Sequence, residues 1–400
     1  MSCAGLAILI IGAVRFVRDI FPLVKALDIL FILLGAGLIF SGIRSLVKSF
    51  LLLLLPSTSE DLVDLVYRKR HLEKGPRVVT IGGGHGLSAL LMGLKKYTTN
   101  LIAVVTVADS GGSSGKLREE FDILPPGDIR NCLVALADAP ALVGKLFQYR
   151  FKKDSVLKGH NFGNLFITAM NEVTGDFKKA IEESSRVLAV RGKVLPSTLN
   201  KVSLVAEFKD GTIAEGEAVI PEKRKPIRRI YLKSVDSELG QEIKPVLEVV
   251  EAIRNAQIIV IGPGSLYTSI LPNMVIKEIT QAVSESRALK IYVCNVMTQP
   301  GETDGFTAFD HVRVLAEHVR GKPFDYCLMN TRIPHEELLA KYRKENALPV
   351  VPDAAKVKAA GYKVVESDLL HATDFVRHDS DKLARIIIGL FKKETFHQSI

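Results

Sequence analysis

The sequence predicts an α/β protein: a Rossmann-like parallel sheet with a β insertion, preceded by an N-terminal hydrophobic membrane segment. Three observations support this fold class. Short β-branched apolar runs end in glycine-rich loops and are followed by helical patterns. Between Val202 and Ser234 the hydrophobic period changes to about two, which indicates antiparallel strands. The first 55 residues are far more apolar than the rest of the chain.

The N-terminal segment contains an uncharged run, Ile29 to Ile43, bounded by Asp28 and Arg44. Residues 26–46 reach the ~17–25 mostly apolar residues that a membrane span requires. The uncharged run at 1–14 is shorter and predicts a weaker span or a half-inserted segment. A signal peptide would need a basic start and a small-residue cleavage site, and neither is visible. A soluble core helix rarely has so much continuous apolar surface.

We therefore expect three regions: membrane-associated helices at 1–55, a linker with a short helix at 56–76, and a nucleotide-binding domain at 77–400. Because nucleotide ligands are cytoplasmic, we expect a cytoplasmic domain tethered to the inner face of the cell membrane. The basic residues at 68–70 support this orientation.

The charge balance favours anionic ligands, because 53 lysines and arginines face 44 aspartates and glutamates. The basic residues are scattered, aromatic residues make up only 7% and tryptophan is absent, so no nucleic-acid partner is predicted. The four cysteines have no zinc-like spacing, which is typical of unpaired thiols in a reducing compartment.

Three glycine-rich loops follow predicted strands: VVTIGGGHGLSALL from Val78, VVTVADSGGSSGKL from Val104 and IIVIGPGSLYTS from Ile258. Glycine allows a backbone to approach a ligand closely. A helix start behind such a loop offers free N–H groups and about +0.5 e of partial charge, so the loops predict a phosphate pocket. The loop residues expected to bind nucleotide or phosphate are Gly83, Gly84, His85, Gly86, Asp109, Ser110, Gly111, Gly112, Ser113, Ser114, Gly262, Gly264, Ser265, Tyr267 and Thr268.

Further segments add polar groups to this set. In PPGDIRN the forked guanidinium of Arg130 suits phosphate, whereas Asp128 reads equally well as a helix N-cap. The loop GHNFGN is either a cap or a contact to sugar or base, and residues 298–303 are a candidate fourth wall. The additional candidates are Arg130, Asn131, His160, Asn164 and Arg377.

Asp109 has several possible roles at the end of the second strand. It could bind a ribose, because residues 84–89 satisfy G-x-G-x-x-A as in an NAD(P)-binding Rossmann enzyme. It could instead hold Mg²⁺ beside phosphates, or cap a turn. The serine- and glycine-rich stretch after it suits phosphate better than ribose. No nucleophile–base pair is compelling, so no catalytic residue is assigned and no redox cofactor is expected.

The combined motifs resemble one family, the YvcK proteins or gluconeogenesis factors, which are relatives of the 2-phospho-L-lactate transferase CofD. The resemblance rests on GGGHGLSALLMGLKKY, VADSGGSSGKLREEFDILPPGDIRNCLVAL, GHNFGNL, VRGKVLPST, IGPGSLYTSILPN and YVCNVMTQPGETDG in this order. It implies a regulatory protein, not an enzyme, that binds a UDP-sugar and acts in cell shape and wall synthesis during gluconeogenic growth. Cell-wall synthesis proteins and a second copy of the chain are the protein partners we expect.

The transferase branch implies the main alternative, an Mg²⁺-dependent enzyme that acts on a guanylylated phospholactate. Members of the YvcK branch often have a second Asp after the Asp of the second loop, and Ser110 takes that place here. This difference argues against a two-carboxylate metal site, and so against transferase chemistry.

Overall fold

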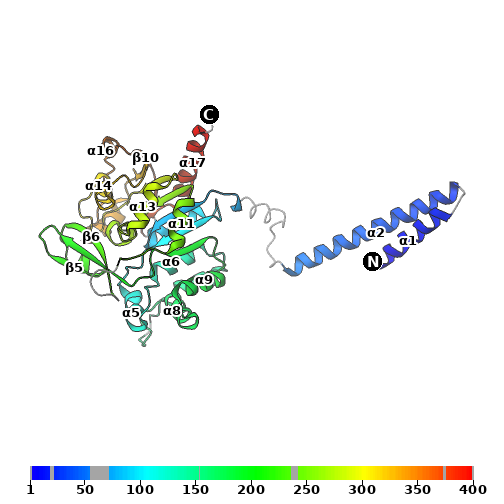
Figure 1. Ribbon diagram of the computed structural model, residues 1–400, viewed down its shortest axis with the longest axis horizontal. Helices are drawn as coiled ribbons and strands as arrows, with labels where there is room; N and C mark the ends of the chain where they lie inside the picture. Colours follow the sequence, from blue (N-terminus) through cyan, green and yellow to red (C-terminus); the bar gives the residue numbers. More distant parts are fainter. Residues whose placement is uncertain are drawn as a thin grey trace. The chain divides into compact units, whose positions relative to one another are not determined.

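The computed structural model describes residues 2–18, 22–54, 72–152, 154–235, 242–372 and 375–398 (Figure 1). They divide into two compact units, with the boundary between Arg68 and Lys69. This boundary falls inside the predicted linker. The short helix expected at 61–70 lies outside the described residues.

The N-terminal unit is an antiparallel pair of helices, α1 (Ser2–Arg18) and α2 (Pro22–Leu54). The helices approach closely at Gly35, where a Cβ would lie 2.7 Å from the amide nitrogen of Leu9 and 2.8 Å from the carbonyl oxygen of Gly5. Only glycine allows this separation. Near the other end of the pair, the buried Asp28 carboxylate lies 3.4 Å from the guanidinium of Arg15.

Within α2, the segment Lys25–Leu46 is long and apolar enough to cross a membrane, with 22 residues and a mean hydropathy of 2.3. Only 11% of its apolar window is buried in the structure, whereas a core helix of a soluble protein would be mostly covered. The apolar part of α1, Ala4–Val17, is shorter, as the sequence predicted.

The second unit is built on one sheet of seven parallel strands in the order β10-β9-β8-β7-β1-β2-β3. Every residue of β1 and β7 is buried, as expected for central parallel strands with both faces covered. The strands are β1 (Val78–Gly82), β2 (Leu101–Val105), β3 (Lys193–Pro196), β7 (Ile258–Ile261), β8 (Leu289–Val293), β9 (Tyr326–Asn330) and β10 (Lys363–Ser367).

The strand order reverses at β1. The chain runs outward from β1 through β2 to β3 and then returns to β7, which pairs with the opposite edge of β1. Val78 is accordingly in register with Leu101 on one side and Ile258 on the other. This is the Rossmann order, and ligands of such sheets bind at the reversal, beyond the carboxyl ends of the strands.

The predicted β insertion is confirmed as a three-stranded antiparallel sheet between β3 and β7. It contains β4 (Val202–Phe208), β5 (Ile213–Glu215) and β6 (Ile227–Ser234), with the one-turn helix α10 (Val219–Glu222) before β6. The tight turn predicted at residues 209–211 joins β4 to β5, with Gly211 at φ +82°.

Helices surround the sheet. They are α4 (Gly84–Leu94), α5 (Gly112–Phe121), α6 (Gly127–Leu136), α7 (Ala141–Gln148), α8 (Phe162–Thr174), α9 (Phe177–Val187), α11 (Leu247–Asn255), the π-helix η1 (Leu266–Ile270), α12 (Leu271–Met274), α13 (Lys277–Glu285), α14 (Ala308–Val319), α15 (Glu336–Lys344), α16 (Ala354–Ala359) and α17 (Ser380–Gln398). A small hairpin of β11 (Leu370–Ala372) and β12 (Val376–His378) precedes α17. Both α4 and α6 begin at a glycine, Gly84 and Gly127, so these glycines belong to the first helical turn.

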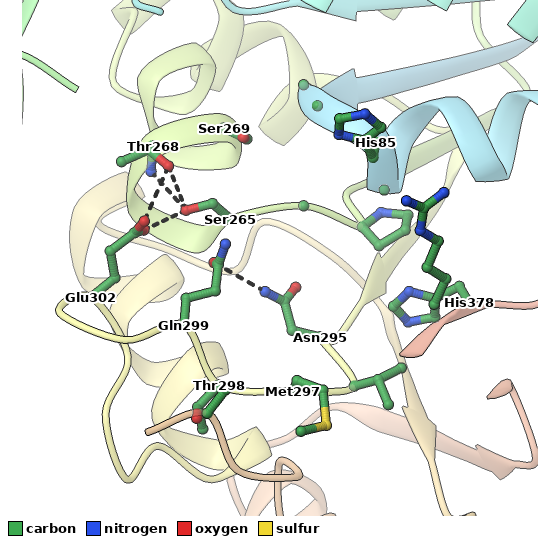
Figure 2. Close-up of a pocket in the computed structure, with 18 of the residues that line it drawn as sticks. His85, Ser265, Thr268, Ser269, Asn295, Met297, Thr298, Gln299, Glu302 and His378 are labelled. Atoms are coloured by element: carbon green, nitrogen blue, oxygen red, sulfur yellow. Dashed lines mark hydrogen bonds between the residues drawn. The ribbon is translucent and has the colours of Figure 1, made fainter. Parts of the chain in front are cut away.

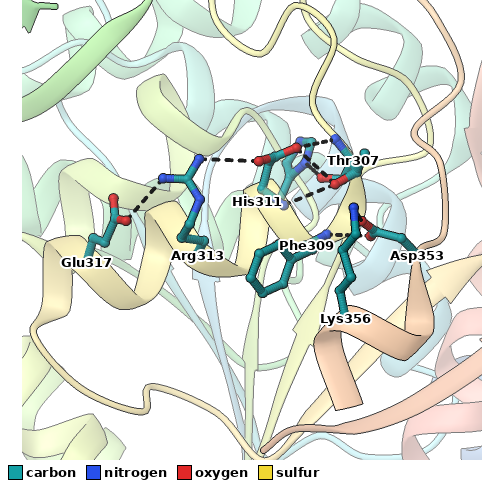
Figure 3. A network of polar contacts seen from close by, with 8 residues as sticks. Thr307, Phe309, His311, Arg313, Glu317, Asp353 and Lys356 are labelled. Carbon is teal, nitrogen blue, oxygen red and sulfur yellow. Dashed lines mark hydrogen bonds and ion pairs between the residues drawn. The ribbon is translucent and has the colours of Figure 1, made fainter. Parts of the chain in front are cut away.

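A polar network fixes the start of α14 (Figure 3). Thr307 and Asp310 form a reciprocal capping box, in which each side chain accepts the other residue's backbone N–H. The Asp353 carboxylate accepts a further helix-start N–H, from Phe309 at 2.8 Å. Arg313 then pairs with both Asp310 and Glu317. The network ties α14 to the segment before α16.

We predict that Thr307→Ala lowers the free energy of unfolding of the protein by about 1–2 kcal/mol, because the Asp310 N–H loses its acceptor. Urea unfolding followed by circular dichroism measures this change. Thr307→Ser keeps the hydroxyl and should recover most of the loss. Equal destabilisation by both variants would show that packing of the threonine methyl group, and not the cap, is responsible.

Candidate functional site

A cleft of about 550 Å³ lies at the strand-order reversal. The loops after β1, β2, β7 and β8 line it, together with residues from the β insertion, the end of α15 and β12 (Figure 2). The three glycine-rich loops of the sequence therefore do meet beyond the carboxyl ends of neighbouring strands. The remaining walls come from Glu217 in the β insertion and from residues 342–347 near the end of α15, which are more than 100 residues apart in the chain.

The floor of the cleft is a direct contact between the first and third glycine loops. Gly84 adopts φ +66°, a left-handed conformation that favours glycine. A Cβ on Gly86 would lie 2.7 Å from the carbonyl oxygen of Pro263, so any other residue would push the two loops apart. The start of α4 lines the cleft, and the Asp128 carboxylate accepts the backbone N–H of Gly84, the first residue of the helix.

Three carboxylates form one wall: Asp109 after β2, Asp128 at the start of α6 and Glu217 in the insertion. Burial and the Asp109 charge raise the pKa of Asp128 to about 7. The same two causes raise the pKa of Glu217 to about 7. Asp109 itself accepts a 2.9 Å hydrogen bond from the Gly111 N–H. This wall is therefore partly protonated near neutral pH and holds fewer negative charges than its composition indicates.

Glu217 supplies the carboxylate that Ser110 does not. The Ser110 backbone N–H donates to the Glu217 carboxylate, and the Ser110 hydroxyl accepts a 3.1 Å hydrogen bond from the Ala218 N–H. The second loop and the β insertion are thus joined at Ser110, the position for which the sequence resemblance implied a second Asp. In the sequence, Ser110 was the only reason to argue against a two-carboxylate metal site. In the folded protein Glu217 supplies a second carboxylate on the same wall as Asp109, so that reason no longer applies.

Cations surround His85 at the centre of the cleft. Burial lowers the pKa of His85, and the charges of Arg377, Arg130 and Arg150 lower it further. The imidazole is therefore neutral at pH 7, in a positive field that suits an anion. Arg377 lines the cleft itself, as the sequence predicted, whereas Arg150 was not among the predicted residues.

His378, the residue after Arg377, has a structural role. His378 is buried, and its Nε2 donates to the carbonyl oxygen of Cys294 at 3.1 Å. Burial lowers the pKa of His378 to about 4, so this side chain is neutral and supplies no cation. It ties the β11–β12 hairpin to the end of β8 and so positions Arg377.

The third loop places its hydroxyls against Glu302 (Figure 2). Ser265 donates to the Glu302 carboxylate, and the Thr268 hydroxyl lies 2.6 Å from the Ser265 oxygen. Ser265 also caps η1 by accepting the Thr268 N–H. Burial raises the pKa of Glu302 to about 7. Of the expected fourth wall at 298–303, Thr298, Gln299, Pro300 and Glu302 line the cleft.

A second polar cluster lies behind Asp109 and does not line the cleft. Its centre is Ser113, whose hydroxyl accepts hydrogen bonds of 3.2 Å from the Asn161 N–H and the Asn164 side chain, while His160 lies 3.4 Å away. Asn161 caps α8. The cluster joins the starts of α5 and α8, so part of the GHNFGN loop has the capping role that the sequence left open.

Nine predicted residues line the cleft: Gly83, Gly84, His85, Gly86, Asp109, Gly264, Ser265, Thr268 and Arg377. Arg130 is buried beside Asn131, to whose side chain it donates at 2.7 Å. Tyr267 is in the core, with its ring against Phe306 and His318, so its position does not support the predicted donor role.

Among the described residues, no group of three or more His, Cys, Asp or Glu side chains converges tightly enough to hold a metal ion by itself. The carboxylate wall suits a different arrangement, in which Mg²⁺ uses one or two carboxylates, keeps waters and shares the phosphate oxygens of a ligand. Asp109 and Glu217 would be its protein ligands. Mg²⁺ at this site stays a prediction.

The fold and the cleft agree with the comparison with known families. Residues 78–370 match the family of 2-phospho-L-lactate transferase CofD, and the chain belongs to this family. The match runs from the first residue of β1 to the β11–β12 hairpin and therefore includes the β insertion. It favours the CofD family over an NAD(P)-binding enzyme.

The curated relatives place the chain in the gluconeogenesis-factor branch. The gluconeogenesis factor of Bacillus subtilis is 47% identical over 319 residues, which are 80% of this chain and 99% of the relative. A Clostridium acetobutylicum relative is 45% identical over 385 residues, 93% of this chain and 84% of its own length. The crystal structure of a Bacillus halodurans protein of the UPF0052 family is 46% identical and has a TM-score of 0.74, covering 78% of this chain and 99% of that one.

We predict that Glu217→Gln stabilises the ligand-free protein at pH 8 by about 1–2 kcal/mol, after allowance for its partial exposure. Folding raises the pKa of Glu217 to about 7, so its contribution to stability is present below the unfolded pKa and is lost as pH rises through 7. The advantage of the variant should disappear at pH 5. Urea unfolding at both pH values measures it.

Glu215→Gln is the matched control, because Glu215 is on the neighbouring strand but is exposed and paired with Lys233. This control should show no gain at pH 8. An equal effect of Glu217→Gln at pH 5 and pH 8 would contradict the assignment of a strained negative charge to Glu217.

Proposed function

We propose that the domain binds a UDP-sugar in the cleft and acts as a regulatory protein of cell shape and wall synthesis under gluconeogenic growth. The observation that carries this proposal is the floor of the cleft, where two glycine loops and the start of α4 converge with His85 and Arg377. Backbone N–H groups and a cation at one point are the groups that bind a diphosphate.

The regulatory role is supported by the relatives, which include proteins named gluconeogenesis factor that align over almost their whole length. The cleft holds one adjacent hydroxyl and carboxylate, Ser265 and Glu302, but the Ser265 hydroxyl also accepts the Thr268 N–H and so caps η1, which is a structural role. Its histidine is kept neutral and surrounded by arginines, an arrangement that serves anion binding. Cell-wall synthesis proteins and a homo-oligomeric assembly belong to the same proposal.

We propose further that the N-terminal unit tethers the domain to the inner face of the membrane. The support is the apolar segment Lys25–Leu46, most of which is exposed. The match to the Clostridium acetobutylicum relative covers 93% of this chain, which leaves too few unmatched residues to omit the segment before the domain. The region aligned with at least one relative therefore includes part of the chain that precedes the domain.

Isothermal titration calorimetry with UDP-N-acetylglucosamine, UDP-glucose, GDP and NAD⁺ tests the ligand. We expect binding of a UDP-sugar that tightens roughly tenfold from pH 8 to pH 6, because protonation of Asp128 and Glu217 reduces repulsion of an anion. Mg²⁺ should flatten this dependence by neutralising the carboxylates. Binding of NAD⁺ with no heat from either UDP-sugar would refute the proposal.

Membrane fractionation of cells that express the full chain tests the tether. We expect the protein in the membrane fraction after washing with carbonate or high salt, since burial of apolar helix surface is insensitive to both. A variant that lacks residues 2–54 should be released into the soluble fraction and should still bind the UDP-sugar. Full-length protein that washes off would exclude a membrane-spanning helix.

A second candidate function is an Mg²⁺-dependent phospholactate transferase, and the carboxylates beside Asp109 favour it. An acceptor hydroxyl would form a bond to the phosphorus of phospholactate, the bond from that phosphorus to the nucleoside monophosphate would break, and the hydroxyl proton would pass to a carboxylate such as Asp128. Asp109→Asn should then abolish turnover and leave nucleotide binding largely intact. Wild-type protein without detectable transfer would exclude this function.

A further inference from the structure

The two ends of the cleft differ in chemistry, and this difference suggests where each part of a ligand lies. One end carries the carboxylate wall, and the centre carries the glycine loops with His85 and Arg377. The other end, beyond β8, is lined by the neutral polar and apolar residues Asn295, Met297, Thr298, Gln299 and Tyr342, and also by the carboxylates of Glu302 and Glu345, which disfavour a phosphate there. A charged diphosphate fits the centre, so an uncharged planar group fits the far end.

The amide groups at this end have unused hydrogen-bonding capacity. Asn295 and Gln299 point toward one another (Figure 2), but their contact, from Asn295 Nδ2 to Gln299 Oε1, is 3.5 Å, the outer limit of a hydrogen bond. Asn295 Oδ1 is buried and has no hydrogen-bond partner among the described residues. A buried acceptor without a partner destabilises the protein by about 1–3 kcal/mol. Because Oδ1 itself has no exposed surface, the Asn295 side chain must turn toward the cleft before a ligand can donate to Oδ1 and recover that loss.

Apolar surface for the face of a ring lies next to these amides. Met297 and Tyr342 are both half-buried at the same end of the cleft. The Tyr342 hydroxyl is already used, because it accepts the Val376 N–H at 2.9 Å. This bond fixes the ring beside the β11–β12 hairpin, which also carries Arg377. The aromatic surface and the cation are therefore held in one arrangement.

We infer that this end of the cleft is a nucleobase subsite in which Asn295 reads the N3–H and O4 edge of uracil, with Gln299 as its support. The inference rests on the proposed function. The unpartnered Oδ1 accepts the ring N–H, and Nδ2 donates to the adjacent carbonyl oxygen. The flat face of the base then lies against Met297 and Tyr342, and the diphosphate extends to Gly86 and Arg377.

The test uses a ligand that lacks the ring donor, 3-methyluridine diphosphate, beside UDP and inorganic pyrophosphate. The full-length wild-type protein should bind UDP about 10- to 100-fold more tightly than the methylated analogue. Asn295→Ala should bind UDP and the analogue with similar affinity, and should bind pyrophosphate as the wild type does. This non-additive pattern isolates the contact between Asn295 and N3–H.

Three further variants serve as controls for this test. Gln299→Ala should reduce the preference for UDP severalfold, because Asn295 loses its support. Asn255→Ala, a matched change on α11 away from the cleft, should leave every affinity unchanged. Thermal unfolding of each variant shows whether it is folded. Asn295→Asp keeps an acceptor for N3–H but loses the donor to O4, so it should bind UDP more weakly and still discriminate against the methylated analogue.

Several outcomes would overturn the inference. One is an Asn295→Ala variant that still discriminates against the methylated analogue. Another is loss of affinity for UDP-sugars without loss for UDP, which would mean that the amides read the sugar. GDP binding more tightly than UDP would replace uracil by guanine. If the wild type binds UDP but no UDP-sugar, the proposed function fails and the base subsite stands.

Discussion

The backbones of Gly86 and Pro263 come so close that no side chain fits between them, and the rest of the site is arranged around this contact. It is possible because the strand order reverses at β1, so that the loops after β1 and β7 leave the sheet side by side. The reversal also opens a cleft above the two loops. The charged side chains of the cleft come from segments outside these two strands. They include Asp109 after β2, Glu217 from the insertion and Arg377 from the hairpin.

The charged groups of the cleft are arranged to bind a ligand that carries several charges. Asp128, Glu217 and Glu302 all have a pKa raised to about 7, and His85 is held neutral by burial and three arginines. Positive and negative groups are thus separated within one cleft, instead of neutralising each other in ion pairs. A ligand with several negative charges, accompanied by a divalent cation, would satisfy both sides at once.

Much of the architecture could be predicted because strong local signals mark it. Central strand β7 is entirely apolar and β1 has Thr80 as its one polar residue, and a clear turn with Gly211 marks the insertion. The edge strands β3 and β10 were not predicted, because Lys193 and Glu366 interrupt any simple pattern. Glu217 could not have been predicted as a site residue, since nothing near it in the sequence distinguishes it from other surface glutamates.

Other differences between expectation and structure have equally physical reasons. Tyr267 follows a glycine loop and carries a hydroxyl, but helical geometry turns its ring into the core. Asp128 fits the pattern of an N-cap, and only its burial next to Asp109 makes it part of the cleft wall. Such roles depend on which elements meet in space, and sequence spacing does not encode that.

The contact between Gly86 and Pro263 also bears on how fast a ligand exchanges. Because these two loops belong to adjacent central strands of the sheet, they cannot separate without breaking the register of β1 and β7. Entry and departure of a ligand must then depend on the outer walls, the β insertion with Glu217 and the hairpin with Arg377. Residence time would be set at the periphery of the domain, while affinity is set at its centre.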